Sequence, residues 1–243
     1  MNNQAEINAA IKAIKQNGGL FFQTLTKNMQ TQKSVIIAAV KDKAIVTNFV
    51  DVRILNNKNF IIELIRANPN AYNYLPDDLK TSPRVAIEAV AHKDAYMFRH
   101  LHPDMKNNFS VCAASVKING SVIQHASPLM RDNIKIIKMA IENTLGAFDY
   151  IAIKHRNNPD LMIHAIGISP IAMKYVGKKL MQNFKFLNAA VAINVGVLEY
   201  TPDYVNGDHD FMISVVKKNK MAIRYASNDL QSNIAKAAIV DNS

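Results

Sequence analysis

Two groups of histidine and aspartate residues carry the side chains that bind metal ions. The first group contains His100, His102 and Asp104; the second contains Asp203, Asp208, His209 and Asp210. A zinc site needs three or four ligands that converge tetrahedrally. Because Asp208 has the position of a helix N-cap and His209 that of a first helical residue, we expect neither group to bind a metal ion.

Motifs for catalysis are absent from the sequence. Cys112 is the only cysteine, which excludes an internal disulfide, and its place on an apolar stripe predicts a buried side chain. The sequence has no glycine-rich phosphate loop, no HExxH motif and no nucleophile elbow. We therefore expect no catalytic residue, no cofactor and no enzyme. A repeat-built enzyme would need acid and base groups that converge in a pocket.

An aromatic residue recurs about every 25 residues, and we call this column the tyrosine ladder. It consists of Phe49, Tyr74, His125, Tyr150, Tyr175, Tyr200 and Tyr225. Tyrosine combines a flat apolar ring with a hydroxyl group, so such a row suits stacking on bases or contact with a partner protein. The alternative, which we favour, is that the column packs together the two halves of each repeat.

Basic residues also recur in columns, and the formal net charge is +10. The basic row, near the end of four consecutive repeats, consists of Lys80, Lys106, Arg131 and Arg156. A second column contains Lys15, Lys41, Arg66, Lys117 and Lys217. Such rows attract polyanions, but cations are also favoured at helix ends and on solvated faces. About half of the repeats have a neutral residue at these positions, which argues against a nucleic-acid-binding repeat in which one residue reads each base.

The elements that carry these columns come from a sequence repeat of 25 residues, or 26 in the first and fourth copies. The repeats begin near Ile7, Lys33, Lys58, Pro83, Phe109, Ile134, Pro159, Phe184 and His209, and a partial tenth begins at Ile234. The phrases NAYNYLPDDLK, from 70 to 80, and GVLEYTPDYVN, from 196 to 206, are the same piece of two repeats. A fixed period of this size is typical of a solenoid.

Apolar residues at positions three, four, seven and eight of each repeat form one stripe of a helix. Position eight is always Ile or Val: Ile14, Val40, Ile65, Val90, Val116, Ile141, Ile166, Val191 and Val216. Position seven is mostly alanine, which lets neighbouring helices approach closely. The first half of each repeat is therefore predicted to be a helix of about ten residues.

Polar residues and prolines mark the ends of these predicted helices. The expected N-caps are Asn57, Ser82, Asn108, Asn133, Asn158, Asn183, Asp208 and Asn233, with Pro83 and Pro159 at first helical positions. Position eleven suits a left-handed helix stop and holds Asn17, Asn68, Asn119, Asn194 and Asn219, with Gly18 and Gly120 after two of them. Pro76, Pro103, Pro128 and Pro202 interrupt the second half, which is predicted to be a short helix, a bend and a further turn of α or 3₁₀ helix.

The composition is that of a soluble globular protein, with 243 residues, of which 49% are apolar and 20% charged. The longest apolar runs contain His and Pro and are shorter than the ~20 residues of a membrane span. The amino terminus does not resemble a secretory signal. We expect a cytoplasmic protein without a membrane span.

The stretches from Phe186 to Asp208 and from Phe211 to Asn233 resemble the helical repeat described as domain of unknown function 4116. The likeness extends over nearly the whole chain and is clearest from Phe109 onward. It implies an α-solenoid and an effector of an intracellular bacterium that acts in a host cytosol, and it supplies no catalytic residues. The stretch IELIRANPNAYNYLPDDL is also similar to the variant leucine-rich repeat, which alternates a helix with a 3₁₀ segment.

The sequence thus predicts an all-α protein, a single α-solenoid domain over residues 1–243. We expect a non-enzymatic scaffold that binds a protein partner with an acidic surface. The alternative is a superhelix that binds nucleic acid through its basic columns and tyrosines. The candidate binding residues are Lys80, Lys106, Arg131, Arg156, Tyr150, Tyr175, Tyr200 and Tyr225.

Overall fold

Each repeat of the computed structural model, which describes residues 3–233, contains three helices, one after another. A long helix, usually of ten residues, comes first, as in α5 (Lys58–Ala67). A 3₁₀ helix follows, as in η3 (Pro69–Tyr74), and then a short α-helix of four residues, as in α6 (Asp77–Lys80). The described residues contain helices and no strand, so the predicted all-α class is confirmed.

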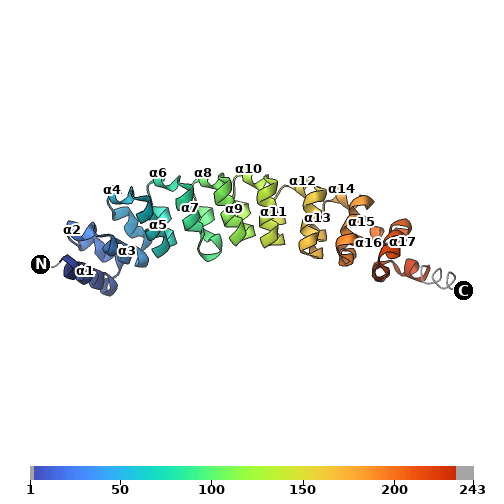
Figure 1. Ribbon diagram of the computed structural model, residues 1–243, viewed down its shortest axis with the longest axis horizontal. Helices are drawn as coiled ribbons and strands as arrows, with labels where there is room; N and C mark the ends of the chain where they lie inside the picture. Colours follow the sequence, from blue (N-terminus) through green and yellow to red (C-terminus); the bar gives the residue numbers. More distant parts are fainter. Residues whose placement is uncertain (1–2, 234–243) are drawn as a thin grey trace. The chain divides into compact units, whose positions relative to one another are not determined.

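The chain divides into an N-terminal unit, Met1–Ala147, and a C-terminal unit, Phe148–Ser243. The long helices of the first are α1 (Asn3–Asn17), α3 (Lys33–Asp42), α5, α7 (Pro83–Val90), α9 (Phe109–Ile118) and α11 (Ile134–Asn143). Those of the second are α13 (Pro159–Ile168), α15 (Phe184–Ile193) and α17 (His209–Lys218). Within each unit, every long helix packs against the next one in the chain (Figure 1).

The 3₁₀ helices form a second row in each unit. They are η1 (Gly19–Thr24), η2 (Ala44–Phe49), η3, η4 (Lys93–His100), η5 (Gly120–His125), η6 (Leu145–Tyr150), η7 (Pro170–Tyr175), η8 (Val195–Tyr200) and η9 (Lys220–Tyr225). The short α-helices are α2 (Lys27–Gln30), α4 (Val52–Leu55), α6, α8 (Pro103–Lys106), α10 (Pro128–Arg131), α12 (Ile153–Arg156), α14 (Lys178–Met181) and α16 (Asp203–Asn206). Neighbours η1 to η5 contact one another in turn, as do η7 to η9.

The apolar stripe of each long helix lies in the core. All position-eight residues from Ile14 to Val191 are buried, and only Val216 is half-exposed. Position seven is buried from Ala39 onward, with alanine in most repeats. These small side chains let the next layer approach closely, which confirms the role predicted for positions seven and eight.

Most of the expected N-caps are also confirmed. The side chains of Asn57, Asn108, Asn133, Asn158, Asn183 and Asp208 accept hydrogen bonds from N–H groups in the first turn of a long helix. Pro83 and Pro159 occupy first helical positions. Ser82 precedes α7 without a side-chain cap. The partial tenth repeat, which would follow Asn233 and begin at Ile234, lies outside the described residues.

The left-handed stop predicted at position eleven is wrong. Asn68 and Asn219 are extended, with φ of −154° and −144°, and Asn119 and Asn194 are similar. Each side chain accepts a hydrogen bond from the N–H two residues later, so these asparagines follow the long helix in an extended conformation and cap the 3₁₀ helix. In the first repeat the left-handed residue is Gly18, with φ of 87°.

The second half of the repeat consists of two short helices separated by a bend, as predicted, and the 3₁₀ helix comes first. Pro76 and Pro202 stand immediately before a short α-helix, whereas Pro103 and Pro128 are its first residues. Proline has no N–H and disfavours a helical residue before it, so it separates the 3₁₀ helix from the short α-helix. The second half is therefore two helices.

Candidate binding surface

The tyrosine ladder lies at the surface because each of its residues is the last residue of a 3₁₀ helix. In the C-terminal unit Tyr150 is exposed, and Tyr175, Tyr200 and Tyr225 are half-buried. In the N-terminal unit Phe49 and His125 are exposed, while Tyr74 is half-buried. The ladder therefore keeps part of each ring available to a partner, although packing covers the rest.

Cations and a second aromatic ring contact the ladder in the C-terminal unit. The Tyr175 ring stacks on Phe148, with 5.0 Å between their centroids and 21° between their planes. Lys174 Nζ lies 4.9 Å from the centroid of the Tyr200 ring. The guanidinium groups of Arg156 and Arg224 lie 5.8 and 5.9 Å from the centroids of the Tyr175 and Tyr225 rings. Ring and cation thus form one mixed surface.

The basic row is less accessible than its sequence suggests. Lys80, Lys106, Arg131 and Arg156 end the short helices α6, α8, α10 and α12, and all four are half-buried. Lys80 Nζ is 3.0 Å from Asp77 Oδ1. Burial lowers the pKa of Lys106. The first three residues belong to the N-terminal unit, and Arg156 belongs to the C-terminal unit.

Arg156 has a structural contact that other repeats reproduce with neutral residues. Its Nη2 donates to the carbonyl oxygen of Phe148 at 2.6 Å, eight residues earlier. At the same place in their repeats, Gln30 donates to Phe22 O and Asn206 to Leu198 O. The last residue of the short helix therefore satisfies a carbonyl near the end of the 3₁₀ helix, which supports the structural alternative for Arg156.

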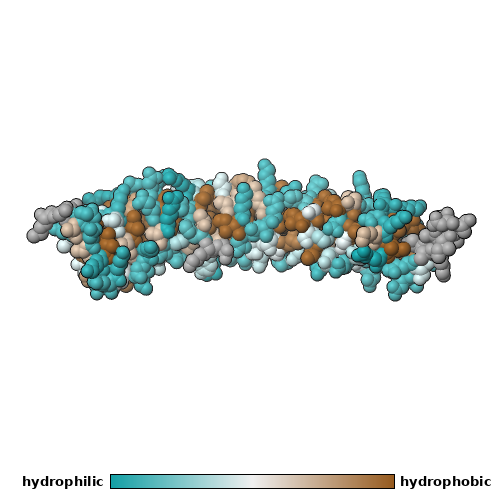
Figure 2. Space-filling model, turned by 60° about the horizontal axis from the view of Figure 1, so that its bottom comes forward, coloured by the Kyte–Doolittle hydropathy of each residue, from teal (hydrophilic) through white to brown (hydrophobic). Residues whose placement is uncertain are grey.

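Apolar side chains reach the surface in both units (Figure 2). Those at the starts of long helices are Phe109, Ile134 and Phe184, and those at the ends are Ile118, Ile168 and Ile193. Phe184 stacks on Phe211 of the next long helix, with 5.3 Å between the ring centroids. These side chains recur with the repeat, as the tyrosines do.

A hollow of about 780 Å³ in the N-terminal unit was not predicted from the sequence. Lys41, Asn70, His92 and Tyr96 contribute polar groups to its wall. Tyr96 is outside the ladder register and follows Ala95, whose φ of 57° is left-handed. A second hollow of about 570 Å³ also includes Lys41. Neither shows converging acid and base groups like those of an active site.

The candidate metal ligands have other contacts. His102 Nδ1 accepts a hydrogen bond from the Asp104 N–H and so caps α8. His209 Nδ1 lies 3.7 Å from Asp210 Oδ1 at the start of α17. Over the described part of the chain, no three His, Cys, Asp or Glu side chains are grouped as a metal site requires.

Cys112 is buried, as predicted, and its Sγ lies 3.2 Å from Lys106 O. Burial raises the pKa of its thiol to about 12. Because the thiolate is the reactive form, this side chain is unsuited to act as a nucleophile in the folded protein.

The fold and this surface define a class: all-α proteins made of short, repeated helical elements with ordered columns of side chains. Two stretches, residues 32–80 and 183–231, match the family described as domain of unknown function (DUF4116). One match lies in each unit, so the predicted resemblance to this helical repeat family is confirmed. The first match precedes Phe109, where the likeness was expected to be weaker.

No curated protein and no solved structure matches the chain significantly. Within residues 3–233, no helix is both long enough and apolar enough to traverse a bilayer.

Proposed function

We propose that the protein is a non-enzymatic α-solenoid scaffold of about nine repeats that binds a protein partner through the tyrosine ladder of its C-terminal unit. The contact surface consists of Tyr150, Tyr175, Tyr200 and Tyr225 with the cations Lys174 and Arg224, whereas Arg156 is held by Phe148 O and Asp149. The partner carries acidic side chains opposite these cations. The resemblance to repeats of suspected bacterial effectors supports a place of action in a host cytosol.

The observation that carries this proposal is the pairing of half-exposed tyrosines with cations at the ends of successive 3₁₀ helices. Tyrosine and arginine are enriched in protein interfaces because a large ring or a planar guanidinium gives much contact area together with hydrogen bonds. Phe148 and Lys174 of the preceding repeats already restrain the Tyr175 and Tyr200 rings, so these two rings lose little side-chain entropy on binding. An acidic partner also suits the net charge of +10.

Nucleic acid is the alternative partner, and the contacts of the rings make it less favoured. Phe148 covers one face of Tyr175, and Lys174 lies over the Tyr200 ring. Stacking on bases requires free ring faces, whereas protein interfaces also use ring edges and hydroxyl groups. Arg156 is already bonded to Phe148 O, so it is not a free phosphate ligand.

Affinity capture with the full chain as bait tests the proposal. Lys174→Glu combined with Arg224→Glu should abolish recovery of the partner, because both changes put negative charge beside the ladder. Lys185→Glu with Lys217→Glu is the matched control, since it makes the same charge change on the long helices α15 and α17. Equal recovery with the ladder variant and the control would contradict the proposed surface, provided that circular dichroism shows both variants folded.

A salt titration separates the two partner classes. Binding of single-stranded RNA or DNA, followed by fluorescence anisotropy, should be absent or weak at low salt. Tight binding that falls steeply with the logarithm of salt concentration would instead indicate phosphate contacts and favour the alternative.

A further inference from the structure

Four basic residues lie together in the N-terminal unit, where the tyrosine ladder is interrupted, and Lys106 O accepts a hydrogen bond from Ser127 N, two residues after His125. His100 and His125 end η4 and η5, two 3₁₀ helices that contact each other. Arg99 precedes His100, and Lys106 ends α8. We call these four residues the cationic cluster.

The Arg99 side chain is positioned by the rings of Tyr96 and His100. Its guanidinium lies over the Tyr96 ring, 4.0 Å from the centroid, and it also bonds the Tyr96 hydroxyl. Arg99 Nε donates to His100 Nε2 at 2.9 Å, and the rings of Tyr96 and His100 are 5.4 Å apart. These contacts orient the guanidinium group.

The cationic cluster has no described counter-charge. Elsewhere in the N-terminal unit cations pair with acids, as Arg66 does with Glu88 and Lys80 with Asp77. None of the four cluster residues forms an ion pair with a described carboxylate. The nearest acid in sequence to Lys106, Asp104, lies 3.6 Å from His102 Nδ1.

Neighbouring positive charges in the cationic cluster make protonation of its two histidines less favourable. Burial lowers the pKa of His100, and the charges of Arg99 and Lys106 lower it further. Burial likewise lowers the pKa of His125, helped by Lys106, Arg99 and His100. Repulsion of this kind among basic groups is relieved when an anion enters.

We infer that Arg99, His100, Lys106 and His125 form a binding site for a phosphate group, free or as a monoester. A tetrahedral dianion presents several acceptor oxygens, which matches a guanidinium, an ammonium and two imidazoles better than a single carboxylate does. The site is separate from the proposed partner surface, because all four residues lie in the N-terminal unit. Its test is therefore independent of partner binding.

The experiment uses the full chain and follows the imidazole proton resonances by NMR while inorganic phosphate is added at constant pH and ionic strength. The resonances of His100 and His125 should move saturably. His209, which is beside Asp210 in the other unit, should not follow the same curve. A second titration with capped phosphoserine distinguishes free phosphate from an esterified group. Equal affinities assign the site to the phosphate alone, and tighter binding of the ester extends it to a phosphorylated side chain.

Two variants and a matched control decide the assignment. Arg99→Gln and His125→Gln should each weaken phosphate binding about tenfold, since each removes a charge-assisted hydrogen bond. Lys27→Gln removes one charge from an exposed lysine whose Nζ bonds Gln30, and it should leave binding unchanged. Absence of saturable shifts, or equal weakening in Lys27→Gln, would overturn the inference. Arg99→Lys should bind with intermediate affinity if the guanidinium geometry matters.

Discussion

The two units of the molecule secure the junction between long helix and 3₁₀ helix differently. In the N-terminal unit, η1 and η5 begin with Gly19 and Gly120, whose N–H groups donate to Asp42 and Asn143 of the next repeat, both at 2.8 Å. A cap from the residue immediately before the 3₁₀ helix occurs in both units: Asn68 and Asn119 in the first, and Ser169, Asn194 and Asn219 in the second. The bond from the next repeat is therefore added in the N-terminal unit, and at η5 both contacts are present.

The glycines explain why the cross-repeat bond does not form in every repeat. A Cβ atom on Gly120 would lie 2.1 Å from Ala140 O, and one on Gly19 would lie 2.5 Å from Ala39 O. At the corresponding position the C-terminal unit has Pro170, Val195 and Lys220. Cross-repeat capping therefore requires an approach so close that a side chain is excluded.

The largest expected effect comes from filling this contact. Gly120→Ala should lower the free energy of unfolding by about 3 kcal/mol, because the backbone of α11 must move away. Gly167→Ala is the matched control in the C-terminal unit, since nothing lies within 4 Å of its added Cβ, and it should be neutral or slightly stabilising. Urea denaturation measures both. Equal stability of the two variants would show that the close approach does not matter.

Removing one cap in each unit should have a smaller effect. Asn143 accepts from Gly120 N and donates to Lys117 O, whereas Asn194 caps η8 through Gly196 N alone. We expect Asn143→Ala to cost about 1.5 kcal/mol and Asn194→Ala about 0.5 kcal/mol, in proportion to the bonds lost. Thermal unfolding of the two proteins decides the order, and the reverse order would contradict the difference between the units.

Cys112 reports on the N-terminal unit alone. Its buried thiol should react slowly with a disulfide reagent in the native protein, because burial raises the pKa to about 12. Asn143→Ala should accelerate the reaction about tenfold if its stability loss promotes local opening. Asn194→Ala, in the other unit, should leave the rate unchanged. An equal acceleration would mean that the units open together.

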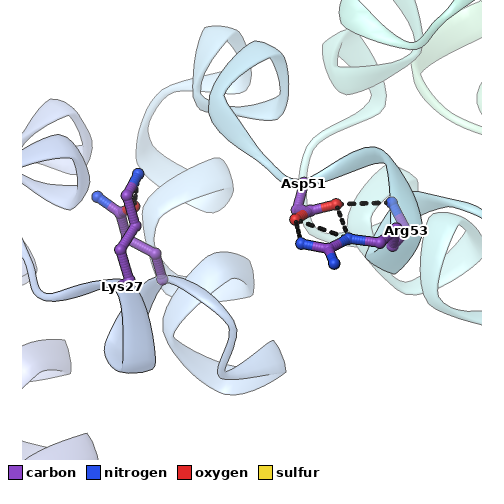
Figure 3. A network of polar contacts seen from close by, with 4 residues as sticks. Lys27, Asp51 and Arg53 are labelled. Carbon is purple, nitrogen blue, oxygen red and sulfur yellow. Dashed lines mark hydrogen bonds and ion pairs between the residues drawn. The ribbon is translucent and has the colours of Figure 1, made fainter.

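The smallest expected effect concerns the short α-helices. Here a local cap is found in the N-terminal unit and a contact from another repeat in the C-terminal unit. In the N-terminal unit Asp51 caps α4 itself and also binds the Arg53 guanidinium (Figure 3). In the C-terminal unit Asn157 of the previous repeat accepts from Leu180 N of α14, while Gly177 leaves room for it.

The hydrogen bonds from the Arg53 side chain and backbone lower the pKa of Asp51 from 3.8 to about 2. Its contribution should therefore be complete above pH 3.8 and be lost as the pH falls through 2. Because the pair is exposed, Asp51→Asn should change the unfolding midpoint only slightly at neutral pH. A large change at neutral pH would contradict this. Differential thermal scans of the variant and the parent protein between neutral and acidic pH measure it.

The sequence predicts those features that depend on residues near one another in the chain. The Ile and Val column buries position eight, and Asn57 or Asp208 caps a helix two or three residues away. The junction residue Asn68 was misassigned because asparagine suits both a left-handed stop and an N-cap. The order of the two helices in the second half was likewise open, since proline indicates a break without giving the helix type.

Contacts between repeats and between columns could not be predicted in the same way. The bond from Asn143 to Gly120 spans 23 residues and depends on how closely α11 approaches η5. The sequence also does not predict that Arg99 lies over Tyr96, because Tyr96 follows a left-handed backbone at Ala95. The half-burial of Lys106 follows from packing that the column of charges does not show.

The paired glycine and Asx residue also bear on how such a chain can evolve. Gly19 with Asp42 and Gly120 with Asn143 are each separated by 23 residues, one member in each of two successive repeats. Duplication or loss of a single repeat between them would leave an unmatched partner, so gene rearrangements that preserve adjacent pairs should survive more often. Related chains should therefore gain or lose both residues of a pair together, so the order of neighbouring repeats should be preserved among them.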